Sequence, residues 1–485
     1  MSAKSISAKS IPEKSISDKT VSEKTEKISA IILAAGKGTR MISPLPKVLH
    51  PVAGIPMIHK VIQACLGCGA EDIRLVVGHQ SNLVKNVANV LPVQCFEQFQ
   101  PLGTADAVKS AQVENMEGLV LIVNGDHPLI QAEDLKRLLL EFKASKADLA
   151  VVTSVVKKPG SLGRIVRSHG ELMAIVEAKD ASKEALKINE VNSGLYLVKS
   201  EVLIDLLPRI RNNNMQKEFY LTDLITIGKE QGYKIKAILA PSAVSFGVNT
   251  QIELAMATKK IFQRTTKKLL ELGVVIIDPN QTYIEETVEI GAGSVIYPGV
   301  YLRGKTKIGA FCVLEPNVFI NDCVLGESVE VKAGSYLEKS KLHNKSTIGP
   351  YARIRPETEI GEEAHIGNFV ELKKVKFGKK SKAGHLTYLG DADVGEEVNI
   401  GCGTITCNYA VDRKKYKTQI GDRVFVGSDV QFVAPIEVGM DAVIASGSTI
   451  TENVPPQSLA VARSRQVNKE KYAERFLKKE NEEGK

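Results

Sequence analysis

Aliphatic residues recur at strict six-residue intervals through the C-terminal half of the chain. Three runs of this kind cover residues 284–320, 348–372 and 420–450, and the position after the aliphatic residue is often Gly. A period of six matches neither an α-helix nor an alternating strand, but it is typical of a parallel β-helix in which each unit is one short strand and a turn. The pattern therefore predicts a parallel β-helix whose aliphatic positions stack into a continuous inner column.

The N-terminal half has a different pattern, in which short apolar runs alternate with amphipathic stretches. Residues 28–33, 72–77 and 119–123 are predicted strands, and 56–66 is a predicted helix. Such an alternation favours a doubly wound α/β domain, with a parallel sheet covered on both faces. Ligands in these sheets bind beyond the carboxyl ends of the strands.

These patterns divide the chain into five parts. We predict a low-complexity tail at 1–27, an α/β domain at 28–250, a linker helix at 251–272, a β-helix at 273–466 and a C-terminal tail at 467–485. The first tail has Lys at five-residue steps among Ser, Glu and short aliphatics, which favours a disordered segment, with a weak helix or a tether as the alternative. It lacks the apolar core of a signal peptide, and no apolar run in the chain has the length of a membrane span.

Charge and cysteine content narrow the class of protein. The net charge is +8, but the two tails hold twelve basic and nine acidic residues, which leaves +5 on the large central part. This excess is too mild to indicate nucleic acid, although it suits small phosphorylated substrates. Seven Cys without a disulfide-like spacing favour a reduced, cytoplasmic protein. Cys65 and Cys68 form an isolated CxxC that we interpret as helix packing, with a metal or redox role as the alternative.

A glycine-bearing turn follows the first predicted strand. Gly36 and Gly38 lie in it, and the cations Lys37, Arg40 and Lys47 lie in it or soon after it. Glycines let backbone N–H groups approach phosphate oxygens, and the cations balance the charge of a triphosphate. The alternative is a plain strand-to-helix turn with solvated basic side chains, but the location beyond a strand end favours phosphate binding.

Asp126 follows the apolar strand 119–123. A Mg²⁺ ion that bridges substrate phosphates to one carboxylate would explain an acidic residue there. Pro128 makes a helix-capping role for Asp126 equally plausible. Residue type alone does not decide between a metal ligand and a helix cap.

Four segments resemble one known family. They are LAAGKGTRM at 33–41, PKVLH at 46–50, GHLTYLGD at 384–391 and GTITCNY at 403–409. The chain resembles, over about 28–466, the bacterial bifunctional family of N-acetylglucosamine-1-phosphate uridyltransferase / glucosamine-1-phosphate N-acetyltransferase. The resemblance implies a Rossmann-like nucleotidyltransferase domain followed by a left-handed parallel β-helix of hexapeptide repeats. It also implies UDP-N-acetylglucosamine synthesis for peptidoglycan and lipid A, from glucosamine 1-phosphate, acetyl-CoA and UTP.

For the uridyltransferase site, the resemblance implies that Arg40 and Lys47 neutralise the triphosphate, and that Asp126 and Asn249 bind Mg²⁺. For Asp126, the resemblance therefore favours metal binding over helix capping. Asn124 stands where the family has Tyr. The implied nucleotide- and sugar-binding residues are Leu33, Ala34, Ala35, Gly36, Lys47, Gln98, Gly103, Thr104, Asn124, Gly125, Asp126, Gly163, Glu177, Asn192 and Asn249.

For the acetyltransferase site, the resemblance implies that His385 is the general base, a role that suits a group titrating near neutral pH. A lone His in a β-helix is otherwise a surface turn residue. The implied sugar-phosphate residues are Arg355, Lys373, Tyr388 and Asn399, and the implied acetyl-CoA residues are Cys402, Asn408, Tyr409, Ser428, Ser446 and Arg463. Cys402 and Ser446 stand where the family often has Ala, so we expect backbone contacts there. Neither Cys402 nor Cys407 has a motif for a covalent acetyl-enzyme.

The six-residue pattern is lost between Thr406 and Ile420, where 409–418 is polar and basic. An insertion there must loop out of the coil. The resemblance implies that this loop reaches a neighbouring subunit and that the β-helices form a homotrimer, with no nucleic-acid or membrane partner.

Two alternative functions predict a different set of residues in the sequence. A nucleotidyltransferase for another sugar, with the repeat as scaffold, predicts damage around His385, Arg355 and Asn408. A regulatory protein like the exchange-factor subunits of eukaryotic translation initiation predicts loss of Arg40, Lys47 and Asp126. All six residues are present, which favours the bifunctional enzyme.

Overall fold

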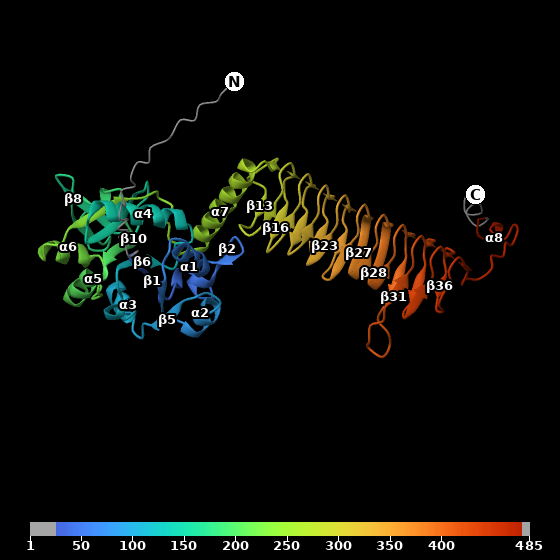
Figure 1. Ribbon diagram of the computed structural model, residues 1–485, viewed down its shortest axis with the longest axis horizontal. Helices are drawn as coiled ribbons and strands as arrows, with labels where there is room; N and C mark the ends of the chain where they lie inside the picture. Colours follow the sequence, from blue (N-terminus) through green and yellow to red (C-terminus); the bar gives the residue numbers. More distant parts are fainter. Residues whose placement is uncertain (1–25, 478–485) are drawn as a thin grey trace, which may run out of the picture. The chain divides into compact units, whose positions relative to one another are not determined.

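The computed structural model describes residues 26–477, so almost all of the predicted N-terminal tail and the last residues of the C-terminal tail lie outside it. The chain forms two compact units (Figure 1). The first comprises the residues up to 49 together with 57–247, and the second comprises 50–56 and everything from 248 onward. The bounds of the five predicted parts are not tested by this division and stay predictions.

A nine-stranded mixed sheet forms the middle of the first unit. Its main path runs β11-β7-β10-β6-β1-β4-β5, and β8 and β9 form a hairpin at its side. The strands are β1 (Ile28–Ala34), β4 (Asp72–Val77), β5 (Gln94–Glu97), β6 (Leu119–Asn124), β7 (Leu149–Val155), β8 (Arg164–Ser168), β9 (Glu171–Val176), β10 (Glu190–Lys199) and β11 (Ile235–Leu239). The three strands predicted from the sequence are therefore confirmed.

The expectation of a wholly parallel sheet is wrong. Strands β4, β1 and β6 run parallel, but β10 pairs antiparallel with both β6 and β7. Parallel neighbours need a long crossover connection, usually a helix. Between β7 and β10, a stretch that the structure describes in full, the chain forms the β8–β9 hairpin and a 3₁₀ turn and no α-helix. It therefore returns in the opposite direction.

Helices cover both faces of this sheet. Helices α1 (Met57–Gly67), α2 (Ser81–Ala88) and α4 (Ala132–Ser145) pack on one side, and α3 (Thr104–Ser110), α5 (Ser200–Leu206) and α6 (Asp223–Glu230) pack on the other. The predicted helix at 56–66 corresponds to α1. Cys65 lies in α1 and Cys68 directly follows it; both are buried and free, and burial raises the pKa of both thiols. These observations support the packing interpretation of the CxxC.

The second unit is a parallel β-helix preceded by α7 (Gln251–Glu271). Thr250 caps α7, because its hydroxyl accepts from the Glu253 N–H (3.2 Å) while the Glu253 carboxylate accepts from the Thr250 N–H (2.9 Å). The short hairpin of β2 (Pro51–Val52) and β3 (Ile55–Pro56) belongs to the same unit.

The strands of the β-helix form one 26-stranded sheet in chain order (Figure 1). They are β12 (Val275–Ile276), β13 (Tyr283–Ile284), β14 (Glu289–Ile290), β15 (Val295–Ile296), β16 (Tyr301–Arg303), β17 (Lys307–Ile308), β18 (Val313–Leu314), β19 (Phe319–Asn321), β20 (Val324–Leu325), β21 (Glu330–Val331), β22 (Tyr336–Glu338), β23 (Ser340–Leu342), β24 (Thr347–Ile348), β25 (Arg353–Ile354), β26 (Thr358–Ile360), β27 (His365–Phe377), β28 (Lys382–Val394), β29 (Asn399–Ile400), β30 (Ile405–Cys407), β31 (Thr418–Ile420), β32 (Phe425–Val426), β33 (Gln431–Val433), β34 (Ile436–Val438), β35 (Val443–Ile444), β36 (Thr449–Ile450) and β37 (Leu459–Ala460).

The predicted inner column is present. Ile284 stacks on Leu302 and Leu302 on Ile320, and all three side chains are fully buried. The column also continues where the six-residue pattern is interrupted, because five-residue steps from Ile320 to Leu325 and from Leu372 to Phe377 still place an aliphatic or aromatic side chain inside. The three runs seen in the sequence are therefore one uninterrupted core.

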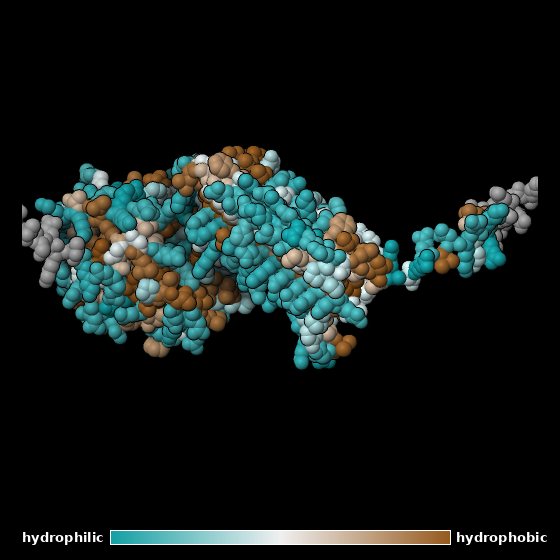
Figure 2. Space-filling model, turned by 45° about the vertical axis from the view of Figure 1, so that its right-hand side comes forward, coloured by the Kyte–Doolittle hydropathy of each residue, from teal (hydrophilic) through white to brown (hydrophobic). Residues whose placement is uncertain are grey.

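The loop predicted after Thr406 projects from the coil between β30 and β31 (Figure 1). It folds as a small hairpin, in which Tyr409 bridges Lys415 and the Ala410 N–H donates to the Lys414 carbonyl at 3.0 Å. Val411 at its tip is fully exposed. The face of the β-helix from which it projects is mostly hydrophilic (Figure 2). Separately, none of the helices within 26–477 combines the length and the apolar character that crossing a membrane requires.

Candidate active sites

The predicted uridyltransferase residues of the first unit gather at the carboxyl ends of its parallel strands. Leu33 on β1 lies opposite Asn124 on β6, and the Gly125 N–H donates to the Leu33 carbonyl at 2.9 Å. Ala34, Ala35 and Gly36 follow at the end of β1, and Gln98 follows β5. A Cβ at Gly36 would meet no atom within 4 Å, so the backbone of the turn is open to a ligand at this point.

Lys47 lies against the glycine turn. Gly38 has a φ of 60°, and a Cβ there would lie 2.6 Å from the Lys47 Cβ, so both the backbone angle and the space require glycine. Arg40 is exposed in the 3₁₀ turn Thr39–Met41, which is anchored by the buried Met41. The structure therefore brings the two predicted triphosphate cations to the same turn.

Asp126 forms an ion pair with Lys47 through its Oδ2 atom, and its Oδ1 atom lies 3.6 Å from His127 Nε2. Only 16% of the Asp126 side chain is exposed. Burial alone would raise the pKa of this carboxyl, but the charges of Lys47 and His127 and a hydrogen bond from Lys47 hold it below its ordinary value. Asp126 is therefore an ionised, sheltered carboxylate beside the glycine turn.

The donor set fits a magnesium ion that is bound mainly by phosphate and water. Among residues 26–477, no three His, Cys, Asp or Glu side chains cluster to hold a metal. Mg²⁺ in phosphate-transfer sites typically takes only one or two protein carboxylates, so a single Asp suffices. Asn249 belongs to the second unit, where its N–H donates to the Glu253 carboxylate at 2.7 Å. Its pairing with Asp126 stays a prediction.

Gln98, Gly103 and Thr104 lie together at the start of α3. Gln98 Nε2 donates to the Gly103 carbonyl at 3.2 Å, and the Thr104 hydroxyl accepts from the Leu221 N–H at 3.0 Å. A Cβ at Gly103 would lie 2.5 Å from the Phe219 carbonyl oxygen, so only glycine fits between the two segments. The loop around Phe219 thus holds this end of the site in place.

A hollow of about 180 Å³ lies beside the strand ends and collects six of the predicted residues. Burial, followed by neighbouring acidic side chains, raises the pKa of Glu177 in this hollow. Asn192 Nδ2 donates to the Tyr196 hydroxyl at 2.9 Å. The six residues are Leu33, Thr104, Asn124, Gly163, Glu177 and Asn192. A polar hollow of this size suits a sugar ring.

In the second unit, four of the six predicted acetyl-CoA residues, Cys402, Ser428, Ser446 and Arg463, form a line along one corner of the β-helix. Asn368 stacks on His385, and the next coil places Cys402 beside them. The Asp429 N–H donates to the Cys402 carbonyl at 2.7 Å, and the Ser428 N–H donates to the Ser446 hydroxyl at 3.1 Å. The Arg463 side chain then passes 3.7 Å from the position of a Cβ at Gly447. Residues far apart in sequence therefore share one line that begins at His385.

Asn368 was missed by the sequence reasoning. Its Oδ1 atom lies 2.7 Å from His385 Nδ1 and accepts a hydrogen bond from that nitrogen. This leaves Nε2 as the basic nitrogen of the ring, because a neutral imidazole carries only one N–H. The signal was available in the repeat itself, since Asn368 occupies the position of His385 one coil earlier.

A cluster of cations lies along an adjacent row. Arg355 precedes Lys373 by one coil, and Arg355 also donates to Glu371 at 2.8 Å. Contact with the Lys415 ammonium, followed by partial burial, lowers the pKa of Lys373. Like charges this close favour an anion between them. Lys415, from the projecting loop, was missed because nothing in the polar run distinguishes it from its neighbours.

Tyr388 and Asn408 converge over Gly390. A Cβ at Gly390 would lie 2.5 Å from the Tyr388 hydroxyl and 2.7 Å from Asn408 Nδ2, and Asn408 also donates to Asp391. Tyr409, at the base of the projecting loop, is 62% exposed.

Asn399 is exposed on β29, and the structure stacks it on Lys382 and Phe425 rather than on the line that contains His385.

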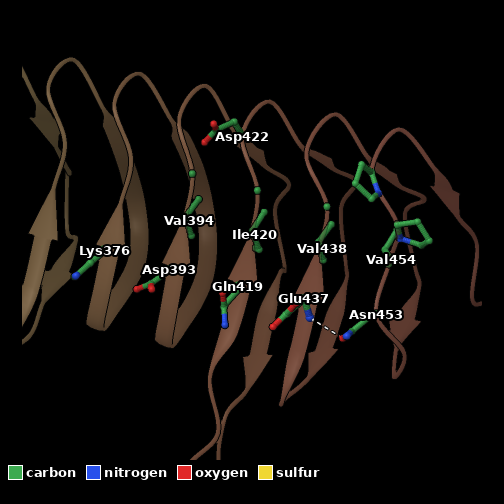
Figure 3. A pocket seen from close by; sticks show the side chains of 15 residues that line it. Lys376, Asp393, Val394, Gln419, Ile420, Asp422, Glu437, Val438, Asn453 and Val454 are labelled. Atoms are coloured by element: carbon green, nitrogen blue, oxygen red, sulfur yellow. Dashed lines mark hydrogen bonds between the residues drawn. The ribbon is translucent and has the colours of Figure 1, made fainter.

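A different corner of the β-helix is also hollowed, with a volume of about 670 Å³ (Figure 3). Buried Val394, Ile420 and Val438 form its base, and the Glu437 N–H donates to Asn453 Oδ1 at 2.9 Å. None of the predicted site residues lines this groove.

Comparisons with known proteins agree with both halves of the fold. The MobA-like NTP transferase domain matches residues 30–188, the GMPPB C-terminal domain matches 278–376, and the bacterial transferase hexapeptide (six repeats) matches 417–452. The bifunctional protein GlmU of Bdellovibrio bacteriovorus is 63% identical over 94% of this chain and 100% of that protein. The protein of the same name from Trichlorobacter lovleyi is 48% identical over 91% of this chain and 97% of its own length.

Fold and sites define a two-domain transferase in which a nucleotidyltransferase precedes a hexapeptide acyltransferase. The chain belongs to the family of the bifunctional protein GlmU. It is therefore a bifunctional enzyme of UDP-N-acetylglucosamine synthesis with uridyltransferase and acetyltransferase activities, as the resemblance implied. Nucleotide substrates, a divalent metal ion and an oligomer-forming β-helix follow from the same matches. Relatives that align over more than nine tenths of the chain disfavour the regulatory and scaffold alternatives.

Proposed function

We propose that the β-helix transfers an acetyl group from acetyl-CoA to the amine of glucosamine 1-phosphate, and that the first domain then couples N-acetylglucosamine 1-phosphate to UTP. The observation that supports this most directly is that the predicted acetyltransferase residues all lie in the second unit, whereas the predicted uridyltransferase residues other than Asn249 lie in the first. The test is to supply each pair of substrates alone. Acetyl-CoA with glucosamine 1-phosphate should release free thiol, and UTP with N-acetylglucosamine 1-phosphate should release pyrophosphate.

In the uridyltransferase site, the sugar phosphate attacks the α-phosphorus of UTP and pyrophosphate leaves. Arg40 and Lys47 balance the negative charge on the triphosphate, so the protein acts mainly by positioning and charge stabilisation. Asp126 would hold Mg²⁺, which supplies further charge neutralisation when bound. Glu177 and Asn192 orient the sugar through its hydroxyls, in the hollow that also contains Gly163.

In the acetyltransferase site, His385 Nε2 takes the proton of the attacking amine while Asn368 holds Nδ1. The nitrogen forms a bond to the acetyl carbonyl carbon, and coenzyme A leaves as the thiol. Arg355, Lys373 and Lys415 bind the sugar phosphate, and Tyr388 orients the sugar. The line of Cys402, Ser428 and Ser446 offers backbone and hydroxyl groups along which acetyl-CoA lies.

The phosphate role of Lys415 has a direct test. Lys415→Met should raise the KM for glucosamine 1-phosphate about 10-fold, because one of three phosphate cations is lost. Uridyltransferase activity should not change. Lys414→Met is the matched control, since Lys414 is an exposed neighbour in the same loop. Equal KM values for the two variants would remove Lys415 from the phosphate site.

We also propose that the enzyme is a homotrimer formed through the β-helix, with Mg²⁺ as its metal and the cytoplasm as its location. An exposed apolar strip of Tyr351, Phe369 and Leu386 beside His385 supports association, because each of these side chains is more than half exposed. Light scattering should give three times the 52.7 kDa of one chain, and a monomer mass would contradict the proposal. The seven free cysteines favour a reducing compartment.

A further inference from the structure

Asp106 lies in the first turn of α3 and contacts Gln98, which the family resemblance implies at the uracil end of the nucleotide. Gln98 Nε2 donates to Asp106 Oδ2 at 2.7 Å and to the Gly103 carbonyl at 3.2 Å. Gln98 as a whole is only 8% exposed. The amide nitrogen of Gln98 therefore donates hydrogen bonds to two separate acceptors.

These two hydrogen bonds fix the orientation of the Gln98 amide group. An ionised carboxylate and a backbone carbonyl can only accept hydrogen bonds. Turning the Gln98 amide over would place its oxygen against both acceptors and lose both bonds. Gln98 Oε1 accepts no hydrogen bond from any residue within 26–477, so it is left as an acceptor of fixed orientation for a ligand.

A donor accompanies this acceptor. The Gly103 N–H, at the start of α3, likewise has no acceptor in the described part of the chain. Uracil presents an oxygen acceptor at C4 beside a donor at N3, which complements one N–H and one carbonyl oxygen. In the same pose, cytosine would present a donor to the Gly103 N–H and an acceptor to Gln98 Oε1, and both contacts would be mismatched.

We infer that Asp106 is a positioning residue that sets the base specificity of the uridyltransferase, because it fixes Gln98 Oε1 as the acceptor for the N3–H of uracil. The inference rests on the proposed uridyltransferase site. It adds a residue that touches neither base nor phosphate and acts only through Gln98.

The test compares Asp106→Ala with Asp106→Asn. Pyrophosphate release is measured with UTP and with CTP at saturating N-acetylglucosamine 1-phosphate, and kcat/KM is compared for the two nucleotides. In Asp106→Ala the preference for UTP over CTP should fall about 10-fold, since a charge-assisted hydrogen bond no longer orients Gln98. Asp106→Asn retains an acceptor and should keep the preference within about 3-fold of wild type.

Two controls separate specificity from stability. Ala favours helices, so Asp106→Ala should retain α3. Lys109→Ala changes an exposed residue on the same helix and should leave the UTP preference unchanged. The KM for N-acetylglucosamine 1-phosphate should also stay constant in both Asp106 variants.

An unchanged UTP preference in Asp106→Ala would overturn the inference. So would an equal loss of preference in both Asp106 variants together with a raised KM for the sugar phosphate, which would indicate a merely structural role. Failure of the proposed function looks different, because the wild-type enzyme would then release no pyrophosphate from UTP at all.

Discussion

We expect His385→Ala to lose acetyl transfer by about 100- to 10,000-fold, the range typical of a removed general base, while uridyl transfer continues at the wild-type rate. The physical reason is that the amine must lose a proton as it attacks, and Asn368 holds the imidazole with Nε2 available for it. Free thiol release from acetyl-CoA measures the first activity, and pyrophosphate release measures the second.

His343→Ala is a suitable control for that variant. His343 lies on the same β-helix, where its Nε2 contacts Glu359 at 2.7 Å, away from the line that contains His385. It should leave both activities unchanged. Equal loss of both activities in folded His385→Ala would contradict the assignment of separate sites, and normal acetyl transfer would exclude His385 as the base.

Asp126→Ala should reduce pyrophosphate release by at least about 100-fold and spare acetyl transfer. The variant removes the sheltered carboxylate that we assign to Mg²⁺ and breaks the ion pair between Asp126 and Lys47. Removal of divalent metal with a chelator should produce the same loss in the wild-type enzyme. Added Mg²⁺ should restore activity to the wild type and not to Asp126→Ala.

A second aspartate in the same domain provides the matched control. Asp148 pairs with Lys199 at 2.8 Å and also accepts from the Lys234 N–H, remote from the glycine turn. Asp148→Asn should leave the metal dependence unchanged. Normal Mg²⁺-dependent release by Asp126→Ala would exclude Asp126 from the metal site.

The sequence predicted the β-helix well, because its core residues recur with a simple period. Strict six-residue spacing nevertheless missed the continuation of the column through Leu325, Leu342 and Phe377. A five-residue step shortens a turn while the next side chain still points inward, so the period breaks although the core does not. The packed core therefore tolerates five-residue steps that break the six-residue pattern of the sequence.

Strand direction was the main error in the first domain. An apolar run marks β10 as buried, but burial carries no information about orientation. The direction follows from the connection, and the β8–β9 hairpin replaces the helix that a parallel strand would need. Likewise, 50–56 lies in the α/β part of the sequence and yet belongs to the second unit.

In the candidate sites, the sequence indicated residues that belong to a motif, and it missed residues whose role depends on which strands or coils are neighbours. Motifs indicated His385, Asp126 and the glycine turn, since these residues have distinctive chemistry at a recognisable spacing. The proposed roles of Asn368, Lys415 and Asp106 come from their contacts with other side chains, and such contacts depend on which coil or turn lies next to which. Only the structure shows which of these residues are neighbours in space.

The most direct test of two cooperating sites in one chain is to supply glucosamine 1-phosphate, acetyl-CoA and UTP together and to follow free thiol and pyrophosphate separately. We predict that both products accumulate and that pyrophosphate lags behind thiol, because the acetylated sugar must form first. Omitting acetyl-CoA should prevent both. Thiol without pyrophosphate, or pyrophosphate without acetyl-CoA, would contradict the account.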